Sequence, residues 1–292
     1  MIPFQFQYEE PESLDEALAA LSKYGEDAKV LAGGTGLINL MKQRLVVPTY
    51  LIGLRRISEL GGIAAQNGDL RIGAGVTHRA LETSREARAH APLLEQTLHH
   101  VATVRIRNSA TIGGALAHAD PNQDLPPALI VLDARVRTRS PRGERELAVA
   151  EIFTGYYETV LQPDELITEV IIPRQPAGTE TAFLKFLPRT QDDYGTVVAA
   201  ARLVLEDGKV SDARVAVGCA GATPIRAEAV EAVLKGRAYS QQLARDAAAQ
   251  VGGVVDPTSD FRGSASYKRD MAVVFVRRAL EQAAAGAGST AN

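Results

Sequence analysis

Two glycine-rich segments in the first half of the chain limit its backbone more than any other feature of the sequence. The first, residues 31–36 (LAGGTG), joins an apolar stretch typical of a strand to a helical pattern at 37–44. Consecutive glycines leave several backbone N–H groups free to point into one hollow, because no Cβ atom stands in the way. A helix that begins behind them adds the positive end of its dipole. This arrangement suits a pyrophosphate group, and Thr35 offers a hydroxyl donor beside it.

The second segment, residues 111–115 (TIGGA), offers the same chemistry: a hydroxyl, two glycines and a small neighbour that allows close approach to the backbone. One such segment alone is more often a tight turn than an anion site, whereas two in one domain favour an anion cradle. The dinucleotide fingerprint is incomplete, because residues 73–78 (GAGVTH) end in His78 where the third glycine belongs. A nucleoside-triphosphatase phosphate loop is also absent from the sequence, so both a Rossmann domain and that class are disfavoured.

The hydrophobic pattern predicts about two domains in the 292 residues, with strands before helices in the second half, an α+β order. Periodicity and caps predict helices at 13–25, 37–44, 78–84, 92–100, 226–234, 240–250 and 264–285. Apolar runs predict strands at 28–32, 50–54, 63–65, 70–74, 164–173, 182–186, 196–205 and 210–217. Hairpin turns are expected at Asn67-Gly68 and Asp207-Gly208. Residues 128–138 are predicted as a strand pair, and residues 108–125 as a long ordered loop.

A change in composition at residues 173–181 (PRQPAGTET) marks the expected linker. We therefore predict a first domain at 1–176, a second domain at 177–286, and a frayed tail of small and polar residues at 287–292.

Composition and charge exclude several classes of function. The formal charge of −3 lacks the basic excess of a nucleic-acid-binding protein. The sequence has no run of about 18 apolar residues, so no membrane span is expected. Its first residues are acidic where a signal peptide would be basic and then apolar, which favours a cytoplasmic protein. Cys219 is the single cysteine, too few for an iron–sulfur cluster, a Cys-type zinc site or an intrachain disulfide.

With both glycine segments in place, the chain resembles the flavin-binding medium subunit of molybdenum hydroxylases, a family that includes aerobic carbon monoxide dehydrogenase and xanthine dehydrogenase. The resemblance covers nearly the whole chain and rests on an ordered set of motifs. These are residues 29–36 (KVLAGGTG) with 40–42 (LMK), 71–78 (RIGAGVTH), 106–108 (IRN) with 111–114 (TIGG), 117–121 (AHADP) with 124–126 (DLP), and Asp260 with 263–265 (GSA) and 267–269 (YKR).

The resemblance implies an α+β fold: an FAD-binding domain of the p-cresol methylhydroxylase type, made of two α/β subdomains, and a small α+β C-terminal domain with an antiparallel sheet and helices. It implies FAD as cofactor, with the pyrophosphate between the two glycine segments, and no metal or catalytic side chain. The FAD-binding residues that it implies are Leu31, Ala32, Gly33, Gly34, Thr35, Gly36, Leu37, Thr111, Ile112, Gly113, Gly114, Ala115, His118, Asp120, Asp124, Ile167, Lys185 and Tyr194.

The resemblance also suggests roles within this set. Asp124 is expected to bind a ribityl or ribose hydroxyl, whereas Lys185 and Tyr194 are expected near the flavin ring. From the residues alone, Lys185 fits a strand-edge lysine equally well, and Asp120 fits the start of a turn. Gly36 and Ala115 stand where many family members carry a polar side chain, so a hydrogen bond is lost while the backbone donors stay.

The resemblance further implies an oxidoreductase subunit that accepts electrons from an iron–sulfur subunit and passes them to NAD, a quinone or oxygen. The partners would be a large molybdenum-cofactor subunit and a small [2Fe-2S] subunit, assembled as a dimer of heterotrimers. With one cysteine in the chain, FAD would be its only redox centre. Two alternatives remain open: a stand-alone flavin-binding carrier or sensor without turnover, and a docking scaffold with a degenerate flavin site.

Overall fold

The computed structural model describes residues 4–187, 190 and 193–289. The chain begins with a three-stranded parallel sheet in the order β1 (Gln7–Glu9), β3 (Tyr50–Gly53), β2 (Ala28–Leu31). The helix α1 (Leu14–Tyr24) starts at Ser13, whose side chain accepts a hydrogen bond from the Glu16 N–H, and it ends at Gly25 as predicted. The helix α2 (Leu37–Lys42) follows β2 directly after the first glycine segment.

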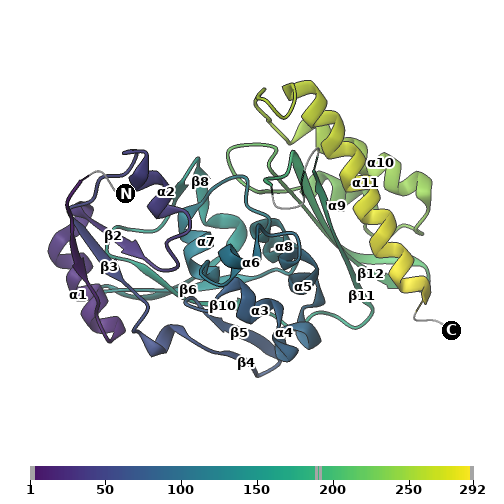
Figure 1. Ribbon diagram of the computed structural model, residues 1–292. Helices are drawn as coiled ribbons and strands as arrows, with labels where there is room; N and C mark the ends of the chain where they lie inside the picture. The colour runs from purple at the N-terminus through teal and green to yellow at the C-terminus, as the bar shows by residue number, and fades with distance from the viewer. Residues whose placement is uncertain (1–3, 188–189, 191–192, 290–292) are drawn as a thin grey trace.

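A five-stranded antiparallel sheet forms the middle of the molecule (Figure 1). Its order is β4 (Ile63–Gln66), β5 (Asp69–Gly73), β10 (Leu166–Ile172), β6 (Arg135–Ser140), β7 (Gly143–Ala148). The predicted turn between β4 and β5 is confirmed, because Asn67 and Gly68 both have positive φ. A short ribbon of β8 (Phe153–Gly155) and β9 (Glu158–Thr159) lies outside this sheet. Six short helices complete this part: α3 (His78–Glu82), α4 (Arg85–His90), α5 (Pro92–Leu98), α6 (Val104–Arg107), α7 (Ile112–His118) and α8 (Leu125–Val131).

Two sequence predictions in this part are wrong. Residues 128–138 are not a strand pair, because their first half belongs to the helix α8, and only Arg135–Ser140 is a strand. Prolines occupy the first turn of α8, where they are tolerated, and all seven helical residues are buried, so the continuous apolar run carries no helical period. Residues 108–125 are not one long loop, because they contain α7, whose two glycines hide its helical pattern.

The C-terminal part is a four-stranded antiparallel sheet with helices on one face (Figure 1). Its order is β11 (Thr179–Phe186), β12 (Val197–Glu206), β13 (Lys209–Gly218), β14 (Ile225–Arg226), and the predicted turn at Asp207-Gly208 is confirmed. The helices are α9 (Glu228–Leu234), α10 (Gln241–Ala249) and α11 (Ala265–Ser289). The helix α11 extends to Ser289, into the segment 287–292 that the sequence predicts as a frayed tail. Residues 290–292 of that segment and residues 1–3 of the first predicted domain lie outside the described part.

The sheet β11–β14 is buried on both faces, which joins the two halves of the molecule. In β12, Val197 and Ala199 pack in the core formed with α9–α11, while Val198 and Ala200 pack in the core of the first half. Because both faces are buried, the first five residues of β12, Val197–Ala201, form a continuous apolar run rather than an alternating one. The expected α+β architecture is therefore confirmed. No helix within the described residues is long and apolar enough to cross a membrane.

Candidate cofactor site

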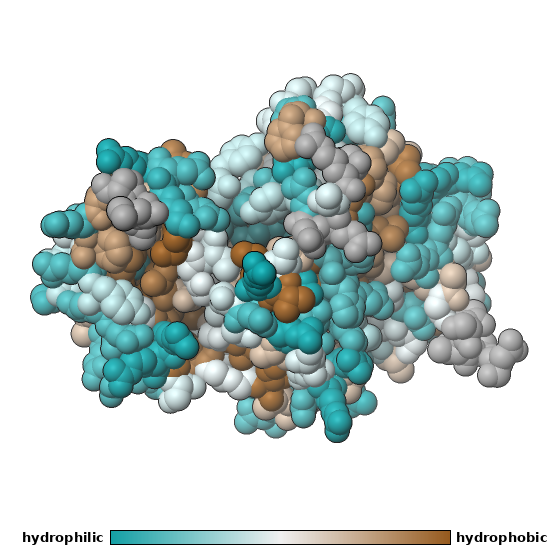
Figure 2. Space-filling model, viewed as in Figure 1, coloured by the Kyte–Doolittle hydropathy of each residue, from teal (hydrophilic) through white to brown (hydrophobic). Residues whose placement is uncertain are grey.

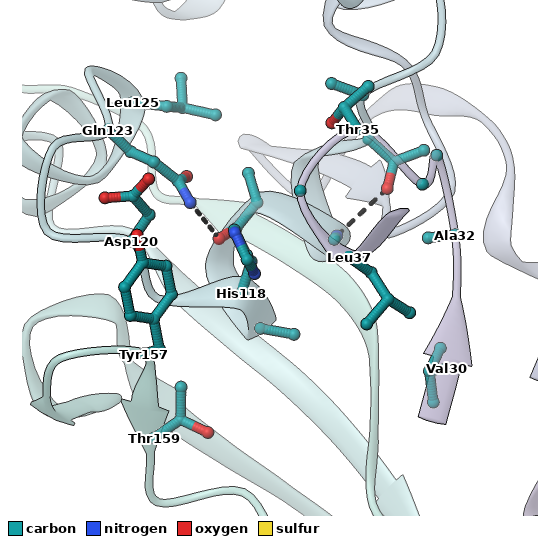
Figure 3. Close-up of a pocket in the computed structure, with 18 of the residues that line it drawn as sticks. Val30, Ala32, Thr35, Leu37, His118, Asp120, Gln123, Leu125, Tyr157 and Thr159 are labelled. Atoms are coloured by element: carbon teal, nitrogen blue, oxygen red, sulfur yellow. Dashed lines mark hydrogen bonds between the residues drawn. The ribbon is translucent and has the colours of Figure 1, made fainter. Parts of the chain in front are cut away.

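A cavity of about 780 Å³ lies where the parallel sheet, the short helices and the C-terminal sheet meet, a size typical of ligand sites. In Figure 3, Thr35 of the first glycine segment and Leu37 at the start of α2 lie on one side, facing His118, Tyr157 and Thr159 on the other. The C-terminal sheet and the loop before β12 complete the wall with Lys185 and Tyr194. The helix α6 exposes the apolar side chains of Val104 and Ile106, which belong to a small brown area near the centre of the face in Figure 2. Ile106 also belongs to the cavity wall.

The first glycine segment presents a row of free backbone donors. Within the described part of the chain, the N–H groups of residues 33–37 donate to no protein acceptor. Gly34 has a φ of +73°, a conformation that L side chains rarely adopt, and Gly36 caps α2 without a side-chain hydrogen bond. Successive unpaired N–H groups of this kind form an anion-binding hollow. The segment therefore has the chemistry expected of a pyrophosphate site.

The second glycine segment differs from the sequence prediction, which gave it the same chemistry. The N–H groups of Ile112 and Gly113 donate to the Val76 and Ala74 carbonyls, at 3.0 and 2.9 Å. The Gly114 N–H donates to Thr111 Oγ1 at 3.1 Å. This segment thus starts a capped helix with its donors already paired, while the Thr111 hydroxyl proton stays available to a ligand.

Gly33 and Gly36 of the first segment instead allow it to lie against Ser109 and His118, the residues that flank the second segment. A Cβ atom at Gly33 would lie 1.8 Å from the Ser109 carbonyl oxygen, and one at Gly36 would lie 2.4 Å from His118 Nε2. Both distances are far below a normal contact, so neither position accepts a side chain without movement of its neighbour. The close approach fixes the first segment against the second and shapes the cavity between them.

The cavity brings together most of the predicted site residues. Those in its wall are Ala32, Gly33, Gly34, Thr35, Gly36, Leu37, Thr111, Gly114, Ala115, His118, Asp120, Asp124, Lys185 and Tyr194. Four predicted residues are not in the wall: Leu31, Ile112, Gly113 and Ile167. Ile112 and Ile167 are buried in the core of the first half, and Gly113 packs against Ala74. For these four, contact with a cofactor stays a prediction.

Asp124 and Lys185 form a buried ion pair across the two halves of the chain. Lys185 Nζ lies 2.8 Å from Asp124 Oδ2 and donates to the His100 carbonyl at 2.9 Å. Asp124 Oδ1 is buried without a hydrogen-bond partner among the described residues. Burial raises the pKa of the Asp124 carboxyl to about 6, although the Lys185 ammonium acts in the opposite direction. An unpaired buried oxygen in a cavity wall is an acceptor for a ligand hydroxyl.

A second polar group surrounds Asp120. Its carboxylate accepts from the Asn122 N–H at 2.9 Å, as the turn prediction requires. Tyr157 and Tyr194, one from each half of the chain, lie close to the same carboxylate. Burial, and secondarily the Asp120 charge, raises the pKa of both phenols, which stay protonated and able to donate. The Tyr157 ring lies 5.2 Å from the His118 ring.

Several wall residues were missed by the sequence reasoning. Gln123 donates from Nε2 to the Ala115 carbonyl at 3.0 Å, a contact visible in Figure 3. Its position between Asp120 and Asp124 in the motif was an available signal. Thr159 belongs to the β8–β9 ribbon, which is too short to leave a sequence pattern. His78 was noted as the residue that breaks the dinucleotide fingerprint, as the end of the family motif at 71–78 and as the start of a helix, but not as a site residue.

The residues of this cavity fit FAD. The free N–H row of residues 33–37 matches a pyrophosphate, and Gly33 and Gly36 allow this row to lie close to Ser109 and His118. Asp124 Oδ1 offers an acceptor for a sugar or ribityl hydroxyl. The fold and the site together define a flavin-dinucleotide-binding protein.

Comparison with known families agrees with this class. Residues 4–175 match the family described as "FAD binding domain in molybdopterin dehydrogenase", and residues 182–283 match "CO dehydrogenase flavoprotein C-terminal domain". The chain belongs to the family of FAD-binding medium subunits of molybdenum hydroxylases, which confirms the resemblance seen in the sequence and makes it an oxidoreductase subunit with FAD as its cofactor.

Individual relatives cover the whole chain. The carbon monoxide dehydrogenase medium chain of Afipia carboxidovorans is 39% identical over 98% of this chain and 99% of its own length. The xanthine dehydrogenase FAD-binding subunit of Escherichia coli O157:H7 is 28% identical, covering 96% of this chain and 97% of its own. A structure of carbon monoxide dehydrogenase from Hydrogenophaga pseudoflava superposes with a TM-score of 0.95 at 38% identity, covering 98% of this chain and 99% of that one. Quinoline 2-oxidoreductase from Pseudomonas putida 86 superposes at 0.92 with 34% identity, covering 97% and 98%.

Proposed function

We propose that this chain is the electron-exit subunit of a molybdenum hydroxylase complex, receiving electrons from a small [2Fe-2S] subunit and delivering them to NAD, a quinone or oxygen. Bound FAD exchanges electrons singly or in pairs, so it can join a one-electron donor to a two-electron acceptor. The observation that carries the proposal is the cavity, which offers a dinucleotide site in a chain whose single cysteine cannot hold an iron–sulfur cluster.

In this proposal the chain binds, orients and shields the cofactor. The N–H row of residues 33–37 holds the pyrophosphate, and the buried Asp124–Lys185 pair fixes the part of the ligand nearest the C-terminal sheet. Tyr157 and Tyr194 limit the access of water from the two halves of the chain. The proposal includes a large molybdenum-cofactor subunit as third partner, a dimer of heterotrimers, and a cytoplasmic location.

A flavin-free complex tests the direction of electron flow. Gly34→Asp introduces a side chain at a left-handed position, with its Cβ against Leu31 and Ile38, and adds a negative charge beside the N–H row; Gly62→Asp is the matched control. Gly62 also has positive φ, but a Cβ there meets open space. We expect the Gly34 variant to lose FAD and the control to retain it. Full retention of FAD by the Gly34 variant would refute the pyrophosphate assignment.

The complexes are then purified from the source organism, reduced anaerobically with limiting dithionite, and mixed with NAD, a quinone or oxygen. Reoxidation of the iron–sulfur centres is expected to be fast in the control and slow in the flavin-free complex. Equal rates in both would show that electrons leave by another subunit. If the chain purifies yellow but alone, at the mass of a monomer, the stand-alone carrier or sensor replaces this proposal.

A further inference from the structure

His78 is a buried polar side chain of the cavity wall that has no assigned role. It begins α3, and its backbone N–H donates to the Ala110 carbonyl at 2.8 Å, which fixes it beside the second glycine segment. The residue is 4% exposed. Neither Nδ1 nor Nε2 forms a hydrogen bond of normal geometry with the residues that the structure describes, and the Thr111 backbone makes only a weak polar contact with the ring. Buried polar groups without partners are rare and call for an explanation.

The surroundings of His78 keep its ring neutral. Burial, and then the nearby Arg107 guanidinium, lowers the pKa of the imidazole to about 4, and the weak polar contact with the Thr111 backbone opposes this. Arg107 is itself paired with Glu82, its Nε lying 3.0 Å from Glu82 Oε2. A neutral imidazole carries one N–H donor and one acceptor nitrogen, so it matches an uncharged ligand edge with both kinds of group.

The neighbouring wall is suited to a ring rather than to a phosphate. Arg107 and the Thr111 backbone act on His78, and Arg107 is itself tied to Glu82 and to the carbonyls of Val101 and Ala102. The cavity wall around these contacts includes the apolar side chains Val101, Ala102, Ile106 and Ala110. Lys185 joins this end of the cavity through the His100 carbonyl. The free N–H row that suits phosphate belongs instead to residues 33–37.

We propose that His78 forms a hydrogen bond with the polar edge of the isoalloxazine ring of bound FAD, which supplies the missing partner of the imidazole. The inference rests on FAD binding by this chain and not on the direction of electron flow. The side chain is thus a cofactor contact, and the apolar wall around it excludes the water that would compete for the same nitrogen atoms.

The test compares two ligands on the flavin-free full-length chain: FAD, which carries the ring, and ADP, which carries the pyrophosphate and adenosine alone. His78→Phe removes both ring nitrogens, whereas His78→Gln and His78→Asn each retain an amide donor and acceptor near one nitrogen position. His90→Gln is the control, because His90 lies on α4 outside the cavity wall. Thermal unfolding without ligand shows that each variant is folded.

We expect His78→Phe to weaken FAD binding by about tenfold, the loss typical of one hydrogen bond, and to leave ADP binding unchanged. The Gln or the Asn variant should recover most of the affinity, and the flavin absorption bands should shift in the Phe variant alone. An equal loss for FAD and ADP would place His78 at the adenosine or the pyrophosphate rather than at the isoalloxazine ring, and would overturn the proposal. Unchanged FAD affinity in a folded Phe variant would make the residue purely structural. Failure of the wild-type chain to bind FAD would refute the proposed function itself.

Discussion

At the scale of single residues, the contact between Gly36 and His118 offers a direct test of how the two glycine segments fit. A Cβ atom at Gly36 would lie 2.4 Å from His118 Nε2. Gly36→Ala should therefore push the segments apart and weaken FAD binding about tenfold or more, because the N–H row moves relative to Thr111. Adding His118→Ala removes the clash, so the double variant should bind FAD more tightly than Gly36→Ala alone.

Fluorescence titration of FAD measures this coupling, as a double-mutant cycle. Gly253→Ala is the control, since a Cβ there meets nothing within 4 Å and the backbone φ is not positive. Additive effects of the two substitutions would show that the steric contact does not set the position of the segments.

The buried carboxyl of Asp124 predicts a particular dependence of stability on pH. Its pKa is about 6 in the folded chain and 3.8 when unperturbed, so between these values the folded state holds a proton that the unfolded state has lost. Its contribution is present below about pH 4 and is lost as the pH rises through 6. Relative to Asp124→Asn, the wild-type chain should lose up to about 3 kcal/mol across this window.

Denaturant titrations of both proteins at pH 4, 5, 6 and 7 measure the difference. Lys185→Met in the Asp124→Asn background supplies the control, because it removes the ammonium that Asp124→Asn leaves buried and unpaired. Parallel curves for the wild type and Asp124→Asn would mean that Lys185 holds the pKa of Asp124 near its ordinary value.

At the scale of elements, the sequence predicted best those segments whose own residues determine their structure. The helix α1 follows from the Ser13 cap, the Gly25 stop and a clear apolar stripe, and both hairpins follow from their Asn-Gly and Asp-Gly turns. The helix α8 was missed because burial on all sides removes the periodic signal. The helix α7 was missed because its two glycines are poor helix formers, and it is favoured by the Thr111 cap together with tertiary contacts to Val76 and Ala74.

The same reasoning limits prediction of the site. The motifs located the glycine segments, Asp120, Asp124 and Lys185, yet they gave both segments the same role. Which N–H groups are free depends on the acceptors Ala74 and Val76 in the turn after β5, and no local pattern contains that information. The neutral, unpartnered state of His78 is likewise a property of the surrounding wall.

The loop before α6 depends on one buried guanidinium. Arg107 donates to Glu82 on α3 and to the carbonyls of Val101 and Ala102, at 2.8 and 2.9 Å, and so holds a loop that lines the cavity. In Arg107→Met, Glu82 keeps its ion pair with Arg79, but the hydrogen bonds to the Val101 and Ala102 carbonyls are lost. The free energy of unfolding should therefore fall by about 3 kcal/mol. Amide exchange at residues 99–106 should accelerate, and FAD affinity should fall.

Hydrogen exchange with mass spectrometry measures the loop directly. Arg105→Met is the matched control, because Arg105 lies on the same short helix and is exposed. Unchanged exchange at 99–106 in the Arg107 variant would show that packing rather than this guanidinium holds the loop.

At the scale of the whole molecule, the cavity depends on how the C-terminal sheet is seated on the first half. Asp133 follows α8 and has a φ of +52°. Its carboxylate forms ion pairs with Arg202 on β12 and Arg214 on β13 of the C-terminal sheet. Its Oδ1 lies 2.8 Å from Arg214 Nε, and its Oδ2 lies 3.0 Å from the nearly buried Arg202. Lys185 lies on β11, which pairs with the strand that carries Arg202. The ion pairs of Asp133 that hold the sheet on the first half should therefore also hold Lys185 in its place in the cavity wall.

Asp133→Asn tests this link, because asparagine tolerates the same positive φ while the carboxylate charge is lost. We expect stability to fall by about 3 kcal/mol, since Arg202 stays buried with fewer partners, and FAD affinity to fall with it because Lys185 loses its fixed position. Asp15→Asn is the control: Asp15 also pairs with an arginine, Arg139, but its side chain is 79% exposed, so the loss should stay below about 1 kcal/mol. Denaturant unfolding and FAD titration of both variants provide the comparison. If Asp133→Asn destabilises the chain yet binds FAD as tightly as Asp15→Asn does, the first half of the molecule completes the site without the sheet.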